Sequence, residues 1–132
     1  MDSSRHLSIA IAAPASEVYA FAADPAHLHL WAAGLAGSTV SDLDGQCFAE
    51  SPVGRVGVEF VARNDFGVLD HVVTLPGGER VLNPLRVIPD GEGCEVVFTM
   101  RRRGTSEEDF ERDCQAVAAD LRTLRSRLER RP

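Results

Sequence analysis

The sequence has 132 residues, of which 44% are hydrophobic and 26% charged, as is typical of one globular domain with a buried core. We therefore expect a single domain over residues 1–132. The formal net charge of −6 argues against a general nucleic-acid binder, because phosphate binding needs clustered positive charge. All 14 basic residues are arginine, and the basic run at residues 101–103 indicates a solvated strand end, with a phosphate or membrane patch as the alternative.

The cysteines, Cys47, Cys94 and Cys114, are odd in number and far apart, so the pattern predicts no disulfide framework. No Cys/His cluster has the spacing of a zinc site. Reduced cysteines favour a cytoplasmic protein. The N-terminal stretch is a poor signal peptide, and no apolar run approaches transmembrane length. We therefore expect no metal, no cofactor and no integral membrane segment.

Residues 6–13 alternate between apolar and polar side chains, with Leu7, Ile9 and Ile11 on one face. This pattern predicts a half-buried strand. Pro14 ends the strand and begins a helix that runs to residue 24. Asp24, followed by proline, ends that helix and caps a second one over residues 25–36.

From residue 38 to 103 the sequence predicts strand after strand, separated by turn-like segments rich in glycine, proline, asparagine and aspartate. Sequential strands joined by short turns form an antiparallel meander, and no helix-length segment lies between them, so a parallel sheet with crossover helices is excluded. The predicted strands are 38–43, 46–51, 55–63, 67–75, 80–88 and 94–102.

The C-terminal segment predicts one long amphipathic helix. Thr105 and Glu108 have the spacing of a capping box, acidic residues occupy the first turn, and arginines occupy the last. Its apolar residues fall within an arc of roughly 80°, so the helix must bury this stripe, and the sheet is its only large partner. The stripe contains Phe110, Cys114, Val117, Leu121, Leu124 and Leu128.

The expected order is strand, two short helices, six strands and a long helix, which makes an α+β fold of about seven antiparallel strands. A curved sheet packed on one helix leaves a gap where a ligand can sit. The order of the predicted elements and the local amino-acid sequence resemble those of the SRPBCC superfamily. This superfamily includes START lipid-transfer domains, the birch pollen allergen family and bacterial polyketide cyclase/dehydrase-like proteins. The similar stretches are APASEVYAFAADPAHLHLWAAGL, VLDHVVTLPGGERVLNPLRVIPDGEGCEVVFTMRR and SEEDFERDCQAVAADLRTLRSRLE.

This resemblance covers nearly the whole chain and is strongest to small bacterial members. It implies a helix-grip fold, in which a curved antiparallel sheet wraps the C-terminal helix around a hydrophobic pocket. It does not imply one reaction, because the superfamily includes binders, transporters, aromatase/cyclases and chaperone-related modules.

His71 is the first candidate for a functional residue. By strand alternation it shares a face with Leu69, Val73 and Leu75, and if that face is concave its imidazole points into the pocket as an acid, a base or a hydrogen-bond donor. The alternative is a structural histidine, either satisfied by a neighbouring strand or lying on the outer face. Asp70 cannot orient His71, because adjacent strand residues face opposite sides.

Arg86 is the second candidate. If Gly77 and Gly78 form a two-residue hairpin turn, the register places Leu69 opposite Arg86 and puts Arg86 on the face of His71. A buried arginine there could polarise a ligand carbonyl or bind a carboxylate.

Pro84 complicates this register. A proline inside a strand indicates an edge or a bulge, and one bulge reverses the facing of Arg86. The alternative is an outward arginine paired with Asp70 or Glu59.

The remaining candidates are apolar residues expected in the core or the pocket wall. Cys114 is expected to be an inert buried thiol on the helix stripe. His27 and His29 point to different sides of a helix and make a poor metal pair. The predicted ligand-binding set is Trp31, Phe48, Phe60, His71, Arg86, Phe98, Met100 and Cys114.

Three functions remain open at this point. The first is a non-catalytic binder of a hydrophobic, lipid-like, aromatic or polyketide-like molecule. The second is a cyclase/dehydratase-like enzyme without a metal, in which His71 transfers a proton and Arg86 stabilises an enolate. The third is a protein-interaction module of the chaperone-activator type, which predicts an exposed apolar patch. A homodimer paired through an edge strand is compatible with all three.

Overall fold

The computed structural model describes residues 3–32, 40–43, 46–51 and 54–129. Its helices are α1 (Ala15–Ala23), the short 3-10 helix η1 (Pro25–His27), α2 (Leu28–Trp31) and α3 (Glu107–Glu129). Its strands are β1 (Ser4–Ile11), β2 (Val40–Leu43), β3 (Gln46–Ser51), β4 (Gly54–Phe60), β5 (His71–Thr74), β6 (Arg80–Asn83), β7 (Leu85–Asp90) and β8 (Gly93–Arg101).

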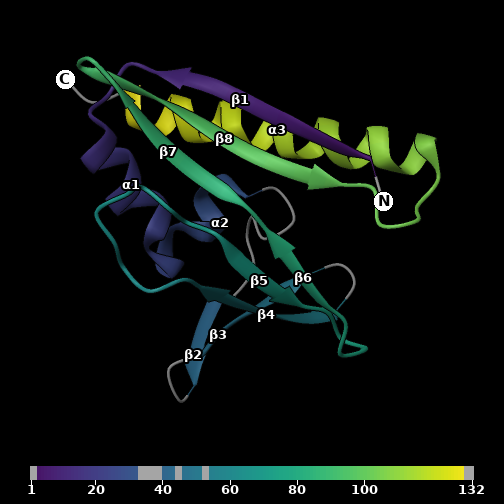
Figure 1. Cartoon of the computed structure of the whole chain (residues 1–132). Coiled ribbons are helices and arrows are strands. Elements are labelled where there is room, and N and C mark those ends of the chain that lie inside the picture. The colour runs from purple at the N-terminus through teal and green to yellow at the C-terminus, as the bar shows by residue number, and fades with distance from the viewer. Residues whose placement is uncertain (1–2, 33–39, 44–45, 52–53, 130–132) are drawn as a thin grey trace.

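All strand pairs are antiparallel, in a three-stranded sheet of order β1-β8-β7 and a five-stranded sheet of order β2-β3-β4-β5-β6. An isolated bridge between Val68 and Arg86 joins the two sheets. Figure 1 shows α3 lying along β1 and β8, with the five-stranded sheet set apart from the helix. Within the described residues, α3 packs mainly on β1 and α2. The expected α+β fold with a long C-terminal helix is confirmed, and its sheet is divided in two.

The division occurs at Pro84. The predicted strand 80–88 is in fact β6 and β7, because proline has no backbone N–H to donate to a neighbouring strand. The carbonyl of Pro84 instead accepts a hydrogen bond from the backbone N–H of Thr99 at 3.0 Å. The chain therefore leaves one sheet and enters the other at this residue.

The hairpin between β5 and β6 has a longer loop than the two-residue turn predicted for it. The N–H of Leu75 donates to the carbonyl of Glu79, and the N–H of Gly78 donates to the carbonyl of Leu75, both at 2.8 Å. Gly78 has a φ of 94° and adds one residue to the loop, as in a three-residue hairpin with a glycine bulge. His71 therefore pairs with Asn83, and the predicted register is wrong by one residue.

The helix starts show one confirmed cap and one correction. The side chain of Asp24 accepts a hydrogen bond from the N–H of Ala26 at 3.0 Å, as predicted. At the start of α3, Ser106 is the capping residue, because its hydroxyl accepts from the N–H of Asp109 at 3.0 Å. Thr105 instead donates its hydroxyl proton to the carbonyl of Arg102. The predicted capping box is therefore one residue too early. The second predicted helix is described only as far as Trp31, and its residues 33–36 lie outside the described residues.

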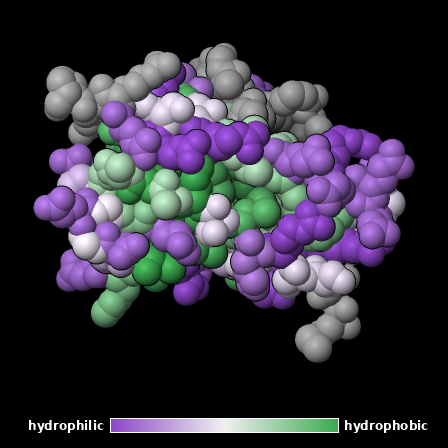
Figure 2. All heavy atoms as spheres, turned by 90° about the horizontal axis from the view of Figure 1, so that it is seen from above, coloured by the Kyte–Doolittle hydropathy of each residue, from purple (hydrophilic) through white to green (hydrophobic). Residues whose placement is uncertain are grey.

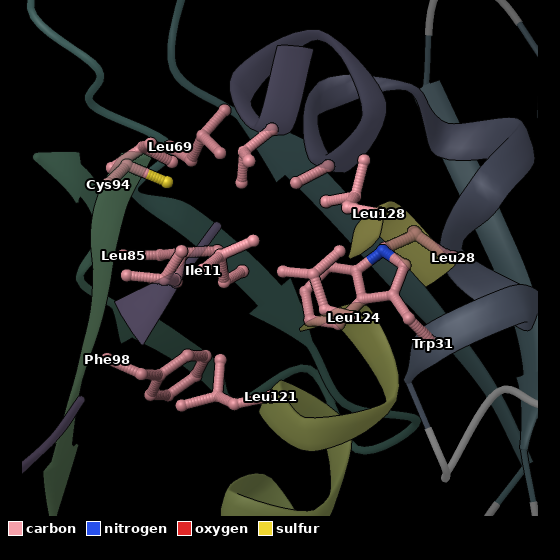
Figure 3. Packing of buried hydrophobic residues seen from close by; sticks show 14 of the residues in the cluster. Ile11, Leu28, Trp31, Leu69, Leu85, Cys94, Phe98, Leu121, Leu124 and Leu128 are labelled. Atoms are coloured by element: carbon pink, nitrogen blue, oxygen red, sulfur yellow. The ribbon is translucent and has the colours of Figure 1, made fainter. Parts of the chain in front are cut away.

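The core lies where α3 meets the three-stranded sheet and α2. Figure 3 shows Leu121 beside Phe98 of β8 and Leu124 beside Trp31 of α2. Leu124 has no exposed surface, and five of the six predicted stripe residues are buried, with Val117 partly buried. The apolar stripe of the helix is therefore confirmed.

Some large apolar side chains reach the surface. Seen from above, hydrophobic residues gather near the middle of the face in Figure 2, with hydrophilic residues around them. Among the described residues, Phe66 is the large apolar side chain with the greatest exposure, at 84%. Within the same part of the chain, no helix combines the length and the hydrophobicity needed to cross a bilayer.

Candidate functional site

A pocket of about 150 Å³ lies between α2, α3 and the strands β4, β5 and β8. We call it the inner pocket. A cavity of roughly this size with apolar walls can bind a small aromatic molecule. Its walls are almost entirely apolar and include three aromatic side chains. The residues that line it are Leu28, Trp31, Ala32, Val58, Phe60, His71, Val73, Phe98, Val117 and Asp120.

His71 lies in this pocket between two aromatic rings. Its ring centroid is 5.1 Å from that of Phe60 and 6.0 Å from that of Phe98. Nδ1 lies 3.1 Å from the carbonyl oxygen of Leu69. A carbonyl oxygen only accepts hydrogen bonds, so this contact assigns the ring proton to Nδ1 and leaves Nε2 with a free lone pair.

The imidazole is neutral near neutral pH. Burial lowers the pKa of His71, an effect that its hydrogen bond to Leu69 and the charge of Asp70 only partly oppose. Among the described residues, Nε2 has no hydrogen-bond partner. The pocket therefore contains an unprotonated nitrogen that can accept a hydrogen bond or a proton.

Two further polar groups belong to the pocket residues. The indole N–H of Trp31 is buried and has no hydrogen-bond partner among the described residues. An unsatisfied buried donor costs free energy, so an acceptor that reached it would be favoured. Asp120, on α3, contributes a carboxylate to the lining.

Four of the predicted ligand-binding residues line the inner pocket: Trp31, Phe60, His71 and Phe98. Met100 lies one inward position further along β8 and lines a neighbouring groove instead. Cys114 is buried on α3 outside the pocket lining, and burial raises the pKa of its thiol, which favours the unreactive protonated form.

Phe48 lies on the other face of the sheet. Its neighbours Cys47 and Ala49 are buried, whereas its own ring is partly exposed and lies 5.8 Å from the guanidinium of Arg55. Strand alternation puts adjacent residues on opposite faces, so its predicted place in the pocket is wrong.

Arg86 also faces away from the pocket. Its guanidinium forms two hydrogen bonds to the carboxylate of Asp70, at 3.1 and 2.9 Å, and its side chain is about half exposed. The placement of Arg86 beside His71 is wrong, because the extra residue at Gly78 shifts the register and reverses its facing. The outward arginine paired with Asp70, left open by the sequence, is the arrangement observed.

The ion pair between Asp70 and Arg86 fixes the seam between the sheets, because Asp70 also accepts a hydrogen bond from the N–H of Leu85 at 2.9 Å. The Arg86 guanidinium holds the pKa of Asp70 below its ordinary range. We expect Asp70→Asn to lower the free energy of unfolding by about 1 kcal/mol at neutral pH, a value reduced for the exposure of Arg86.

The pH dependence has a defined sign. A carboxyl whose folded-state pKa is depressed stabilises the fold above its unfolded pKa of about 3.9. That contribution is lost as the pH falls through the folded pKa, so wild type and Asp70→Asn should become equally stable in acid. Urea unfolding of both proteins from neutral to acidic pH measures this, and a difference that persists in acid would contradict it.

Asp120 is a pocket residue that the sequence did not predict. Asp120 is three residues beyond Val117 and one before Leu121, so it borders the apolar stripe of α3. A carboxylate at the edge of a buried helical face is the signal that could have revealed it.

The described residues contain no group of three or more histidine, cysteine and acidic side chains that could hold a metal ion. His27 stacks on Phe21 with ring centroids 4.2 Å apart, and its Nδ1 lies 2.9 Å from the carbonyl oxygen of Phe21. His27 therefore has a structural role.

Comparison with known families gives a match over nearly the whole chain. The family described as polyketide cyclase / dehydrase and lipid transport matches residues 5–131. The chain belongs to this family. The match confirms the SRPBCC resemblance of the sequence. The search of curated proteins gave no match to this chain.

Solved structures similar to this family member share its fold. DynU16, a protein of the dynemicin biosynthetic locus, is 15% identical with a TM-score of 0.75, and the match covers 98% of this chain and 48% of DynU16. Protein CV1439 from Chromobacterium violaceum is 15% identical with a TM-score of 0.74, covering 97% and 99% of the two chains. Norcoclaurine synthase from Thalictrum flavum is 11% identical with a TM-score of 0.69, covering 100% and 96%. The family member thus spans about half the length of DynU16, and identities this low establish the fold alone.

Proposed function

We propose that this protein binds a small aromatic molecule in the inner pocket, with a hydroxyl group of the ligand donating a hydrogen bond to Nε2 of His71. The observation that carries the proposal is the position of the His71 imidazole, whose Nδ1 contacts the Leu69 carbonyl and whose ring lies between two aromatic rings in a mostly apolar pocket. Aromatic walls favour a flat apolar ligand through stacking and edge contacts. Nε2 of His71 then favours a ligand that carries a hydrogen-bond donor.

The expected size of this selectivity follows from ordinary hydrogen-bond energies. A neutral hydrogen bond contributes about 0.5–1.5 kcal/mol net, which corresponds to roughly a 2- to 13-fold difference in affinity. The matched probes are 2-naphthol, which has a hydroxyl donor, and 2-methoxynaphthalene, which has the same rings and no donor.

Trp31 provides the measurement, because it is the only tryptophan in the chain and it lines the inner pocket. Titration with each naphthalene should change the emission of Trp31 until the pocket is saturated. We expect tighter binding of 2-naphthol by a factor within the range above. Failure of both probes to bind would refute the proposal.

Two variants separate the role of His71 from a general effect on the fold. His71→Phe keeps an aromatic ring and removes the Nε2 acceptor, so the preference for 2-naphthol should shrink by the factor given above. Arg86→Gln, on the opposite face of the sheet, should keep the preference for 2-naphthol. A preference that survives His71→Phe would exclude the imidazole as its source.

The preference should also depend on pH. The pKa of His71 lies below the ordinary value of about 6.5, so Nε2 accepts a hydrogen bond at neutral pH. As the pH falls through the folded pKa, Nε2 gains a proton and can no longer accept. The selectivity for 2-naphthol should therefore vanish on acidification in wild type, and a pH-independent selectivity would contradict the assigned tautomer.

A second candidate function is proton transfer of the cyclase/dehydratase type. It is favoured by the unprotonated nitrogen of His71 in the same pocket as the Asp120 carboxylate, and Arg86 has no part in it. Native mass spectrometry of the purified protein should detect a co-purifying aromatic ligand. Incubation of that ligand with the protein then distinguishes the candidates, since a binder returns it unchanged and an enzyme converts it.

A further inference from the structure

A second hollow adjoins the inner pocket. It measures about 320 Å³ and lies between β5, β6, the end of β8 and the first half of α3. We call it the outer groove. Val73 of β5 lines both spaces. Ligand sites usually measure about 300–1,000 Å³, so the inner pocket alone is small and the two spaces together reach the usual range.

The register of β5 and β6 decides which of their residues face these spaces. Opposed residues of two antiparallel strands point their side chains to the same face of the sheet. His71 pairs with Asn83, and Val73 pairs with Val81. Because His71 and Val73 line the inner pocket, Asn83 and Val81 lie on the same inward face.

The exposure of the neighbouring side chains agrees with this assignment. Leu82, which lies between Val81 and Asn83 in β6, is more than half exposed, whereas Val81 and Asn83 are half-buried. On β8, Met100 is two residues beyond Phe98 and is half-buried on the same inward face. Val73, Val81 and Met100 therefore form an apolar floor under the outer groove.

Asn83 is the polar side chain beside this floor. Asparagine is depleted in strands, and its amide adds nothing to an apolar surface. Within the described part of the chain, the side-chain amide of Asn83 has no hydrogen-bond partner. An amide can both donate and accept a hydrogen bond. The amide of Asn83 is thus available to a molecule that lies in the groove.

Asn83 also lies where the two sheets meet. It is the last residue of β6, and the carbonyl of Pro84, the next residue, bonds to Thr99 of β8. Directly opposed residues such as His71 and Asn83 have Cβ atoms about 4.5–5.5 Å apart. One ligand can therefore contact Nε2 of His71 and the amide of Asn83 together. Both groups stand on the same wall, so they meet the same edge of that ligand.

We propose that Asn83 is a second polar contact for the ligand of the inner pocket, and that the natural ligand is an aromatic molecule with two polar groups along one edge. The proposal rests on the proposed function of the inner pocket. Nε2 of His71 accepts from a hydroxyl, as proposed above, and the Asn83 amide bonds to a second hydroxyl or to a carbonyl. The rings of the ligand extend from the inner pocket over the apolar floor of the outer groove.

The test uses two isomers with the same rings and the same number of hydroxyl groups. In 2,7-dihydroxynaphthalene both hydroxyls lie along one edge, and in 2,6-dihydroxynaphthalene they lie on opposite edges. Emission of Trp31 measures the binding of each. We expect 2,7-dihydroxynaphthalene to bind more tightly by roughly 2- to 13-fold, the effect of one additional neutral hydrogen bond.

Two variants assign this preference to Asn83. Asn83→Leu replaces the amide by an apolar group of similar volume, so the two isomers should bind equally. The same variant should keep the preference for 2-naphthol over 2-methoxynaphthalene, which shows that the inner pocket is intact. Thr74→Val is the matched control, because it removes a polar group from the opposite face of the same strand pair, where Thr74 pairs with Arg80. It should keep the preference for 2,7-dihydroxynaphthalene.

The outcomes separate this proposal from the proposed function. If 2-naphthol keeps its advantage over 2-methoxynaphthalene but the two diols bind equally, the contact at Asn83 is wrong and the proposed function stands. A preference for 2,7-dihydroxynaphthalene that persists in Asn83→Leu also overturns the contact. If 2-naphthol has no advantage, or no naphthalene binds, the proposed function fails and the contact at Asn83, which rests on it, fails with it.

Discussion

Replacing Leu124 by alanine is expected to lower the free energy of unfolding by about 2–5 kcal/mol, the usual cost of a large cavity in a packed core. Leu124 has no exposed surface and packs beside Trp31 at the centre of the cluster that joins α3 to the sheet and to α2 (Figure 3). The neighbours belong to separate elements that are tied down elsewhere, so they cannot collapse into the space left by the side chain.

Leu82→Ala is the matched control, because it removes the same atoms from a side chain that is 55% exposed. It should change stability by no more than about 0.5 kcal/mol. Urea unfolding followed by Trp31 emission measures both variants. Equal losses in the two proteins would mean that α3 is not packed as described.

The second large effect is expected at Gly67. This residue has a φ of 72°, and a Cβ atom placed on it would lie 2.1 Å from the carbonyl oxygen of Val87. Gly67→Ala must therefore displace Val87, and it breaks the hydrogen bond from the Val87 N–H to the Gly67 carbonyl. We expect the free energy of unfolding to fall by about 3–5 kcal/mol, because the left-handed backbone, the clash and the broken hydrogen bond all contribute.

The loop around Gly67 cannot relax freely, because the side chain of Asn64 holds it. Its Oδ1 accepts from the N–H groups of Phe66 and Val68, and its Nδ2 donates to the Val68 carbonyl. Gly78→Ala is the control. Gly78 has a φ of 94° and open space around the missing Cβ. Gly78→Ala should therefore lower the free energy of unfolding only by the cost of the left-handed backbone, about 1–2 kcal/mol. If the free energy of unfolding fell by similar amounts in both variants, the clash at Gly67 would be relieved by movement of the chain, and the prediction would be wrong.

The order of elements could be predicted because its signals are local. The alternation of Leu7, Ile9 and Ile11 and the stripe of α3 each depend on the chemistry of neighbouring residues alone, and both are observed. The division of the sheet could not be predicted from local signals, because Pro84 indicated only an edge or a bulge. Whether the chain continues in the same sheet after Pro84 depends on which strand meets its carbonyl, and that strand, β8, is distant in sequence.

The site could be predicted only in part, for a similar reason. His71 and its aromatic neighbours follow from alternation along single strands. The position of Arg86 depended on the count of residues in one turn, where Gly77–Gly78 allows either two or three. A difference of one residue moved the arginine to the other face. Asp120 borders the apolar stripe of α3, but its place in the pocket depends on how α3 lies relative to β5, which is a tertiary relation.

At Pro84 the chain passes between the two sheets, and these sheets form opposite walls of the inner pocket. His71 and Phe60 stand on the five-stranded sheet, whereas Phe98 stands on the three-stranded sheet that carries α3. The described connections between these sheets include the bridge of Val68 with Arg86, the hydrogen bond from the Leu69 N–H to the Leu85 carbonyl, and the ion pair of Asp70 with Arg86. The width of the inner pocket is therefore set by the angle between the two sheets, which this seam holds. Substitutions at the seam should therefore change the thickness of the ligand that fits the inner pocket more than they change the packing around Leu124.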